Sequence, residues 1–100
     1  MRYRVKLSRQ AVVDIDKVYD YIEQMLFAPI AAENFLRGIY ASIAALETHA
    51  PIYAVSTYRD VLRYGQNART IVYKGFTVIY TLHGRYVVVH RIIHGSLIKG

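Results

Sequence analysis

The chain has 100 residues, of which 54% are hydrophobic and 20% are charged. This composition supports a buried core, and the length matches one domain, so we expect residues 1–100 to fold as a single unit. The sequence contains no cysteine, which excludes disulfides and thiolate metal sites and is consistent with a cytoplasmic protein. No apolar run reaches the ~18 residues of a membrane span, so we expect no membrane association.

The net charge of +6 suits binding to nucleic acid or to an acidic protein, and it is also compatible with solubility alone. Ten tyrosines and no tryptophan are present. Tyrosine combines an apolar ring with a polar hydroxyl, and it is therefore favoured at interfaces. The composition leaves nucleic acid and protein partners both open.

The first half of the chain predicts a strand followed by two helices. Polar and apolar residues alternate over residues 2–7, which is the period of a strand with one buried face. Ser8 is a suitable N-cap for a helix to about residue 26, because apolar residues then recur at steps of three and four. Pro29 suits the first turn of a second helix, in which Gly38 predicts close packing against another element.

The second half predicts a loop and then a sheet. Residues 50–67 have no clear period, and we expect a loop with a short strand around Tyr58 to Leu62. Three β-runs follow, and they are separated by turns at Gly75 and at His83-Gly84. The runs cover residues 69–74, 76–82 and 86–93. The last two are nearly continuous in β-branched and aromatic residues, so we expect their strands in the centre of the sheet.

The order strand-helix-helix-strand-strand-strand predicts a two-layer α+β domain. A helical hairpin would cover one face of a twisted, mostly antiparallel sheet. The first strand must join the C-terminal strands, because no other sheet is predicted. The register of the last hairpin stays open, since a two-residue turn and a three-residue turn place Arg91 on opposite faces.

The sequence contains no spacing typical of a metal or nucleotide site. P-loop and nucleophile-elbow motifs are absent. His90 and His94 lie four residues apart on one predicted strand, ~13 Å, which is too far to share an ion. Asp14, Asp16 and Asp20 do not fall on one helical face, so we expect a solvated surface there. We therefore expect neither a metal nor another cofactor.

Several segments resemble the RelE/ParE toxin superfamily. Residues 75–80 (Gly-Phe-Thr-Val-Ile-Tyr) and 87–95 (Val-Val-Val-His-Arg-Ile-Ile-His-Gly) resemble the closing hairpin of these toxins. The first helix is similar to theirs at Ala11, Asp14, Ile15, Tyr21 and Ile22. Residues 29–35, with Leu46 and Pro51, resemble the second helix of the ParE branch. The resemblance covers nearly the whole chain and implies the toxin of a bacterial type II toxin–antitoxin pair.

The resemblance implies one of the two activities found in this superfamily. RelE-like toxins cut messenger RNA on the ribosome, whereas ParE-like toxins poison DNA gyrase. RelE-like enzymes carry an Arg in the third strand, and an Arg and a Tyr or His after the last strand. Thr77 occupies the first of these positions, and residues 96–100 (Ser-Leu-Ile-Lys-Gly) contain neither Arg nor Tyr. The resemblance therefore favours a gyrase inhibitor without enzymatic activity.

Two alternatives stay open. The chain could be a metal-independent endoribonuclease, in which basic side chains bind the phosphate and move protons. The candidate catalytic residues would then be Arg69, Lys74, Arg91 and His94. His94 stands at the end of an apolar strand, where a capping role suits it equally. The chain could also be a non-toxic binding module of the same fold.

The resemblance also implies a cognate antitoxin as protein partner. Such antitoxins wrap the toxin with a tail that places a helix in an apolar groove and a strand on a sheet edge. A toxin of charge +6 favours acidic residues on that tail. The predicted partner-binding residues are Tyr53, Tyr58, Arg59, Arg63 and Tyr64, although the tyrosines would equally suit a cover for the helical hairpin. A surface for RNA would combine the cations Arg59, Arg63, Arg69 and Lys74 with Tyr58, Tyr64 and Tyr73. Gyrase, or alternatively ribosome-bound mRNA, is the expected target, and a homodimer or a toxin–antitoxin hetero-oligomer is possible.

Overall fold

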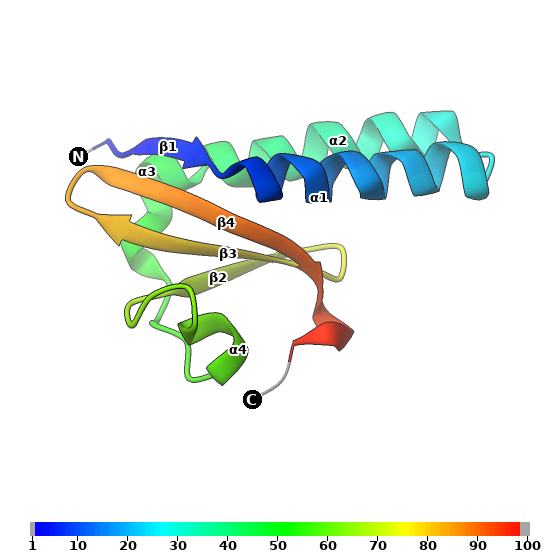
Figure 1. Cartoon of the computed structure of the whole chain (residues 1–100). Helices are drawn as coiled ribbons and strands as arrows, with labels where there is room; N and C mark the ends of the chain where they lie inside the picture. Colours follow the sequence, from blue (N-terminus) through cyan, green and yellow to red (C-terminus); the bar gives the residue numbers. More distant parts are fainter. Residues whose placement is uncertain (1, 99–100) are drawn as a thin grey trace.

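The computed structural model describes residues 2–98, and it consists of a helical hairpin packed on a four-stranded sheet (Figure 1). The predicted α+β fold is confirmed. The main elements are β1 (Arg4–Leu7), α1 (Arg9–Asp20), α2 (Pro29–Ala44), β2 (Arg69–Tyr73), β3 (Phe76–His83) and β4 (Tyr86–His94). The shorter helical segments are η1 (Tyr21–Met25), α3 (Leu46–His49), η2 (Ala50–Ile52), α4 (Arg59–Leu62) and η3 (Gly95–Leu97).

The sheet has the strand order β1-β4-β3-β2, so β3 and β4 are central as predicted. β1 pairs with β4 in parallel, and the other two pairings are antiparallel. The turn at 74–75 has two residues with φ of 47° and 83°, which are the angles of a type I′ hairpin. The turn between β3 and β4 lies at 84–85, one residue later than predicted, because His83 pairs with Tyr86.

A β-bulge settles the register of the last hairpin. Ile79 lies opposite Arg91, whereas Tyr80 lies opposite Val89, so His90 is the extra residue on β4. With this register the guanidinium of Arg91 reaches the carboxylate of Asp14 on α1.

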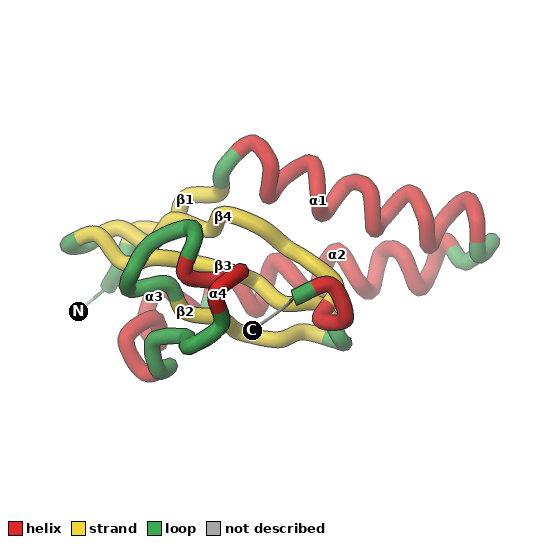
Figure 2. Tube along the Cα trace, turned by 60° about the horizontal axis from the view of Figure 1, so that its bottom comes forward, coloured by secondary structure: helices red, strands yellow, loops and turns green. Residues whose placement is uncertain are grey.

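Helices α1 and α2 run antiparallel over the sheet and continue past its end (Figures 1 and 2). The predicted cap is confirmed, because the Oγ of Ser8 accepts a hydrogen bond from the N–H of Ala11 at 3.0 Å. The last turn of the predicted first helix is the π-helix η1, and Pro29 begins α2 as expected. Within residues 2–98, no helix combines the length and apolar character needed to cross a bilayer.

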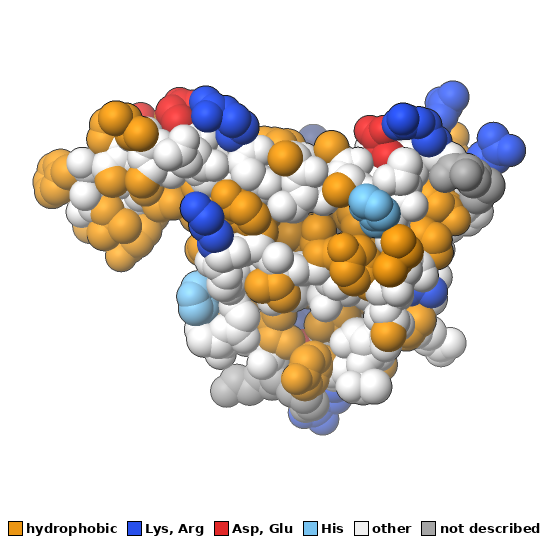
Figure 3. Space-filling model, turned by 180° about the vertical axis from the view of Figure 1, so that it is seen from behind, with side chains coloured by type: hydrophobic (Ala, Val, Ile, Leu, Met, Phe, Trp, Pro, Cys, Tyr) orange, Lys and Arg blue, Asp and Glu red, His pale blue; other side chains and the backbone are white. Residues whose placement is uncertain are grey.

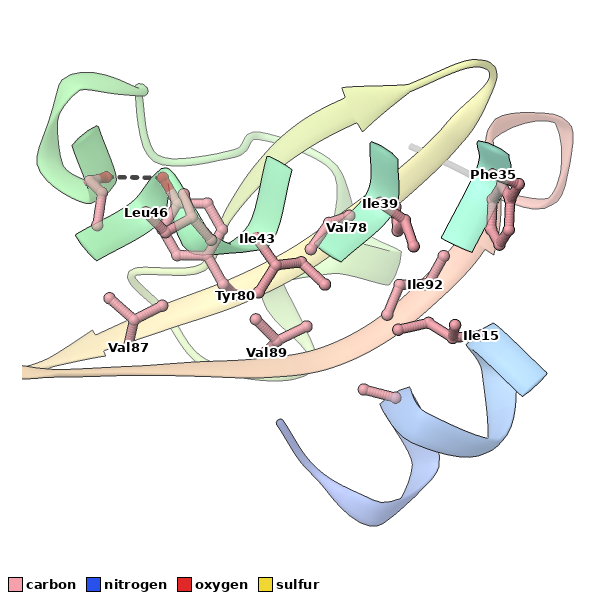
Figure 4. Close-up of a cluster of buried hydrophobic side chains, with 12 residues drawn as sticks. Ile15, Phe35, Ile39, Ile43, Leu46, Val78, Tyr80, Val87, Val89 and Ile92 are labelled. Carbon is pink, nitrogen blue, oxygen red and sulfur yellow. Dashed lines mark hydrogen bonds between the residues drawn. The ribbon is translucent and has the colours of Figure 1, made fainter. Parts of the chain in front are cut away.

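The main core lies between the helices and the sheet (Figure 4). The helices contribute Ile15, Phe35, Ile39, Ile43 and Leu46, and the strands contribute Val78, Tyr80, Val87, Val89 and Ile92. The hydroxyl of Tyr80 donates a hydrogen bond to the carbonyl of Ala50 at 2.6 Å. This bond satisfies a buried polar group and joins the sheet to the segment that follows α3.

Gly38 allows α2 to lie close to β2. A Cβ atom at this position would stand 1.8 Å from the hydroxyl oxygen of Tyr73. The ring of Tyr73 thus occupies the space that any other residue would need. The close packing predicted for this glycine is confirmed.

The other face of the sheet is partly covered by α4 (Figure 1). The strand predicted from Tyr58 to Leu62 is wrong, because this segment forms one turn of helix. The N–H groups of Val61 and Leu62 bond to the carbonyl of Tyr58 at 3.1 and 3.0 Å instead of pairing with a strand. The turn buries Val61 completely, in a small second core beside Ile79.

Candidate functional site

Two hollows flank the C-terminal end of β4. The first, which we call the α1–β4 groove, has a volume of about 240 Å³. Its basic side chains are Lys17, Arg91 and His94, and its one acidic side chain is Asp14. Its apolar lining comes from Val18, Phe76, Ile92, Ile93 and Leu97. A peptide segment with an apolar face and acidic side chains matches this lining.

Asp14 joins α1 to β4 at the base of this groove. Its carboxylate accepts hydrogen bonds from Nε and Nη2 of Arg91 at 2.7 and 3.1 Å, and from the N–H of Ile92 at 3.0 Å. The side chain of Gln10 donates a further bond at 3.0 Å. Burial alone would raise the pKa of Asp14, but these hydrogen bonds, led by that from Arg91, outweigh burial and lower it.

The sequence-based expectation of a solvated acidic surface is therefore wrong at Asp14, whose side chain is only 7% exposed. Its partner Arg91 stands 77 residues later in the chain, so no local pattern identifies the pair. The hydrogen bonds that Arg91 donates to Asp14 also hold the pKa of Arg91 above its ordinary value. The guanidinium of Arg91 is thus a permanent cation whose Nε and Nη2 are engaged by a buried carboxylate.

His94 acts as the cap of η3. Its Nδ1 lies 2.7 Å from the Oγ of Ser96 and accepts a hydrogen bond from the N–H of Ser96 at 3.3 Å. The ring also stands edge-on to Phe76, with centroids 5.4 Å apart. Of the two roles that the sequence offers for His94, capping is the one that this geometry supports.

The four residues of the predicted ribonuclease set do not form one cluster. Arg91 and His94 line the groove, and Lys74 stands in the β2–β3 turn at the same end of the sheet. Arg69 begins β2 at the other end, five residues and about 17 Å from Lys74 along the strand. Two of its guanidinium nitrogens, Nε and Nη1, are buried without a hydrogen-bond partner. The geometry therefore brings three of the four residues to one end of the sheet and leaves Arg69 at the other.

The second hollow, which we call the α4 hollow, has a volume of about 210 Å³. Its lining comes from Tyr58, Val61, Thr70, Val72, Thr77, Gly95 and Ile98. Thr77 is largely buried and its hydroxyl is uncharged, so the position where the resemblance would place an Arg supplies no charge to this surface. The tail is described only to Ile98, and the predicted absence of Arg and Tyr at 99–100 lies outside the described residues.

The predicted partner-binding residues divide into two groups. The exposed ones are Tyr53, Tyr58, Arg59 and Arg63, which lie before, on and just after α4. Tyr64 instead turns inward, where its ring lies 5.6 Å from that of His90. Of the first group, Tyr58 lines the α4 hollow, and Tyr64 belongs to the packing of the sheet.

A histidine pair that sequence reasoning missed lies beside Tyr64. The Oγ1 of Thr81 stands 2.6 Å from Nε2 of His83 and 2.7 Å from Nε2 of His90, and Thr81 is fully buried. A hydroxyl has one hydrogen, so it donates to one ring and accepts from the other. Burial, and secondly the nearby His83, lower the pKa of His90. Only the register of β3 and β4 brings these residues together, and no sequence motif signals it.

We expect the chain to lose stability in two steps as the pH falls. The folded pKa of His90 is lower than its usual 6.5, so the unfolded chain takes up the proton first and unfolding becomes more favourable below that pH. The folded pKa of Asp14 is likewise below 3.8, which produces a second loss in more acidic solution. Thermal melts from about pH 8 to about pH 3 would resolve both steps. His90→Gln should flatten the first step alone, and an unchanged first step would contradict its assignment to His90.

The comparisons with known proteins agree with this architecture. The chain matches the family model described as "ParE toxin of type II toxin-antitoxin system, parDE" over residues 5–98. A solved structure titled "Chromosomal ParDE TA system from P. aeruginosa" is similar in fold, with a TM-score of 0.75 and 22% sequence identity. That similarity covers 93% of this chain and 96% of the other. No curated protein matches.

The family model extends from β1 to the residue after η3, so it includes both helices, the whole sheet and both hollows. The resemblance read from the last hairpin and the second helix is thereby confirmed, on the ParE side of the superfamily. The chain belongs to the ParE family, the toxins of type II toxin–antitoxin systems.

Proposed function

We propose that this toxin inhibits DNA gyrase by binding to it in the bacterial cytoplasm, and that a cognate antitoxin neutralises it. The observation that carries the proposal is the ion pair between Asp14 and Arg91. RNA cleavage needs cations that are free to stabilise charge on a phosphate. The guanidinium of Arg91 instead binds the carboxylate of Asp14 and thereby joins β4 to α1. Inhibition by binding needs only a stable surface, so the family and the ion pair together support it.

The α1–β4 groove supports an acidic segment as its occupant. Lys17 and Arg91 stand against the one carboxylate of Asp14, which Arg91 already binds, so Lys17 is the cation that an acidic side chain would meet, and most of the remaining lining is apolar. We infer that the antitoxin tail places an amphipathic segment here, with acidic side chains toward the basic ones. The outer edge of β2 at the exposed Val72 offers a second contact for an added strand. The α4 hollow, with Tyr58 on its rim, extends this surface.

Two assays on the purified toxin separate the candidate activities. We expect it to block supercoiling of relaxed plasmid by gyrase and to leave ribosome-bound mRNA intact. Cleavage of the mRNA with normal supercoiling would instead establish the ribonuclease alternative. A chain that melts cooperatively, binds its antitoxin and does neither would be a non-toxic binding module.

A further inference from the structure

The far end of the helical hairpin projects beyond the sheet and carries an apolar tip (Figures 1 and 3). We call residues 19–33 the distal arm. The side chains at its end are more than half exposed, and they are Tyr21, Met25, Leu26, Phe27 and Ile30. Single exposed apolar residues are ordinary, but five at the end of one helical hairpin form a patch of the kind that contacts another molecule.

The arm has a defined structure up to this tip. The hydroxyl of Tyr19 on α1 donates to Glu33 of α2 at 2.7 Å, and it also lies 3.3 Å from a carboxylate oxygen of Glu23. The pKa of Tyr19 is raised to about 12, mainly by the hydrogen bond to Glu33, so the phenol stays protonated as a donor. A side-chain hydrogen bond thus joins the two helices close to the tip.

Phe27 occupies a backbone position that normally belongs to glycine. Its φ is +52°, and the N–H of the next residue, Ala28, bonds to the carbonyl of Ile22 at 3.1 Å. The bond reaches back six residues, one more than the closing bond of a Schellman motif, and it likewise encloses a left-handed residue of the kind that is usually glycine, because a side chain there is strained. The ring of Phe27 is 87% exposed, so packing within this chain does not offset the strain. Strain and exposure at one residue indicate a role outside the monomer.

The distal arm is also the acidic part of a basic protein. It contains Asp20, Glu23 and Glu33 and neither Lys nor Arg, so its formal charge is −3. Since the whole chain carries +6, the remaining residues together carry +9. A partner of the arm should therefore combine an apolar pocket with positive charge around it.

We propose that the distal arm is the element that docks on gyrase, with Phe27 and its neighbours entering an apolar pocket bordered by basic side chains. This inference rests on the proposed function, which names that enzyme. An enzyme that holds DNA carries basic surface for the phosphates, and such a surface complements the charge of the arm.

The antitoxin fits the arm poorly. An acidic, partly apolar tail matches the apolar lining and Lys17 of the α1–β4 groove, and it would be repelled by the three carboxylates of the arm. The two partners therefore use separate surfaces of the toxin.

The test compares wild type with Phe27→Gly, Ile52→Ala and Asp20→Lys, by direct binding to purified gyrase and by supercoiling of relaxed plasmid. Phe27→Gly removes the ring and suits the left-handed backbone, so its melting temperature should be unchanged or higher. We expect it to weaken binding and inhibition at least ~tenfold, as for an anchoring aromatic residue. Ile52→Ala, which alters an exposed side chain outside the arm, should match wild type. Asp20→Lys should weaken binding and reduce its dependence on salt.

Each contrary outcome has a distinct meaning. Equal inhibition by wild type and Phe27→Gly would overturn the docking inference and leave gyrase inhibition standing. A folded wild type that neither binds nor inhibits gyrase would overturn the proposed function and the inference with it. Concentration-dependent dimers of wild type that Phe27→Gly abolishes, with inhibition unchanged, would make a second copy the occupant and would also overturn the inference.

Discussion

Replacing Arg91 by alanine should destabilise the fold by about 3 kcal/mol, because the substitution leaves the buried carboxylate of Asp14 without its cation. The N–H of Ile92 and the amide of Gln10 would still bond to that carboxylate, so the loss should fall at the lower end of the range for broken buried pairs. A domain of this size has a total stability of about 5–15 kcal/mol, so the loss is a large share. Urea unfolding monitored by circular dichroism measures it directly.

Two further variants separate charge from geometry at this pair. Arg91→Lys keeps the charge but cannot form the bidentate contact with the carboxylate, so it should lower the stability by about 1 kcal/mol. The double variant Asp14→Ala/Arg91→Ala should cost less than the two single losses added, because it removes the buried charge together with its partner. An Arg91→Ala variant that unfolds like wild type but is no longer toxic would show that Arg91 acts on the target and not on the fold.

Phe35→Ala should cost about 3–5 kcal/mol, the largest loss that we expect from a single substitution in the core. Phe35 is 4% exposed, and its ring centroid lies 5.5 Å from that of Phe76 and 6.2 Å from that of Tyr73. Phe76 in turn stands edge-on to His94 and lines the α1–β4 groove. The substitution should therefore loosen the groove as well as the core, and lower affinity for an acidic antitoxin peptide.

The matched control lies on the same helix. Ile30→Ala changes a side chain of α2 that is 76% exposed, and its effect on unfolding should stay within about 0.5 kcal/mol. Phe35→Leu keeps most of the volume and should cost about 1 kcal/mol. If Phe35→Ala unfolded at the same urea concentration as Ile30→Ala, the aromatic cluster would not contribute as we describe.

Repeating patterns in the sequence predicted most of the fold. Ser8, Pro29 and the apolar steps of three and four located both helices, because burial of one face imposes the helical period over many residues. The two central strands followed from runs of β-branched residues in the same way. α4 was missed because four residues contain no period, and a single buried side chain, Val61, decides its conformation.

The candidate site was less predictable, because it depends on contacts between distant residues. The sequence pattern places Asp14 on a solvated helix surface, but β4 brings Arg91 to it, and the bulge at His90 determines that approach. The left-handed backbone at Phe27 has no signal, since the sequence carries no glycine or asparagine at that position. Periodic patterns in the sequence indicate which face of a helix or strand is buried. They give no information about the register between distant strands or about an exposed turn with a strained backbone.

Because β1 pairs in parallel with β4, the four-stranded sheet cannot form completely until β4 has been synthesised. Arg4 lies opposite Tyr86, and Val87 and Val89 complete the core under the helices. As the chain leaves the ribosome, both helices therefore appear long before the surface that buries their apolar faces. Contacts of such wide sequence separation slow folding, because the loop must close before any of them contributes. A nascent chain that ends before β4 would lack Val87, Val89 and Ile92 of the core and the β4 side of the groove, so the complete fold forms only after β4 has been synthesised.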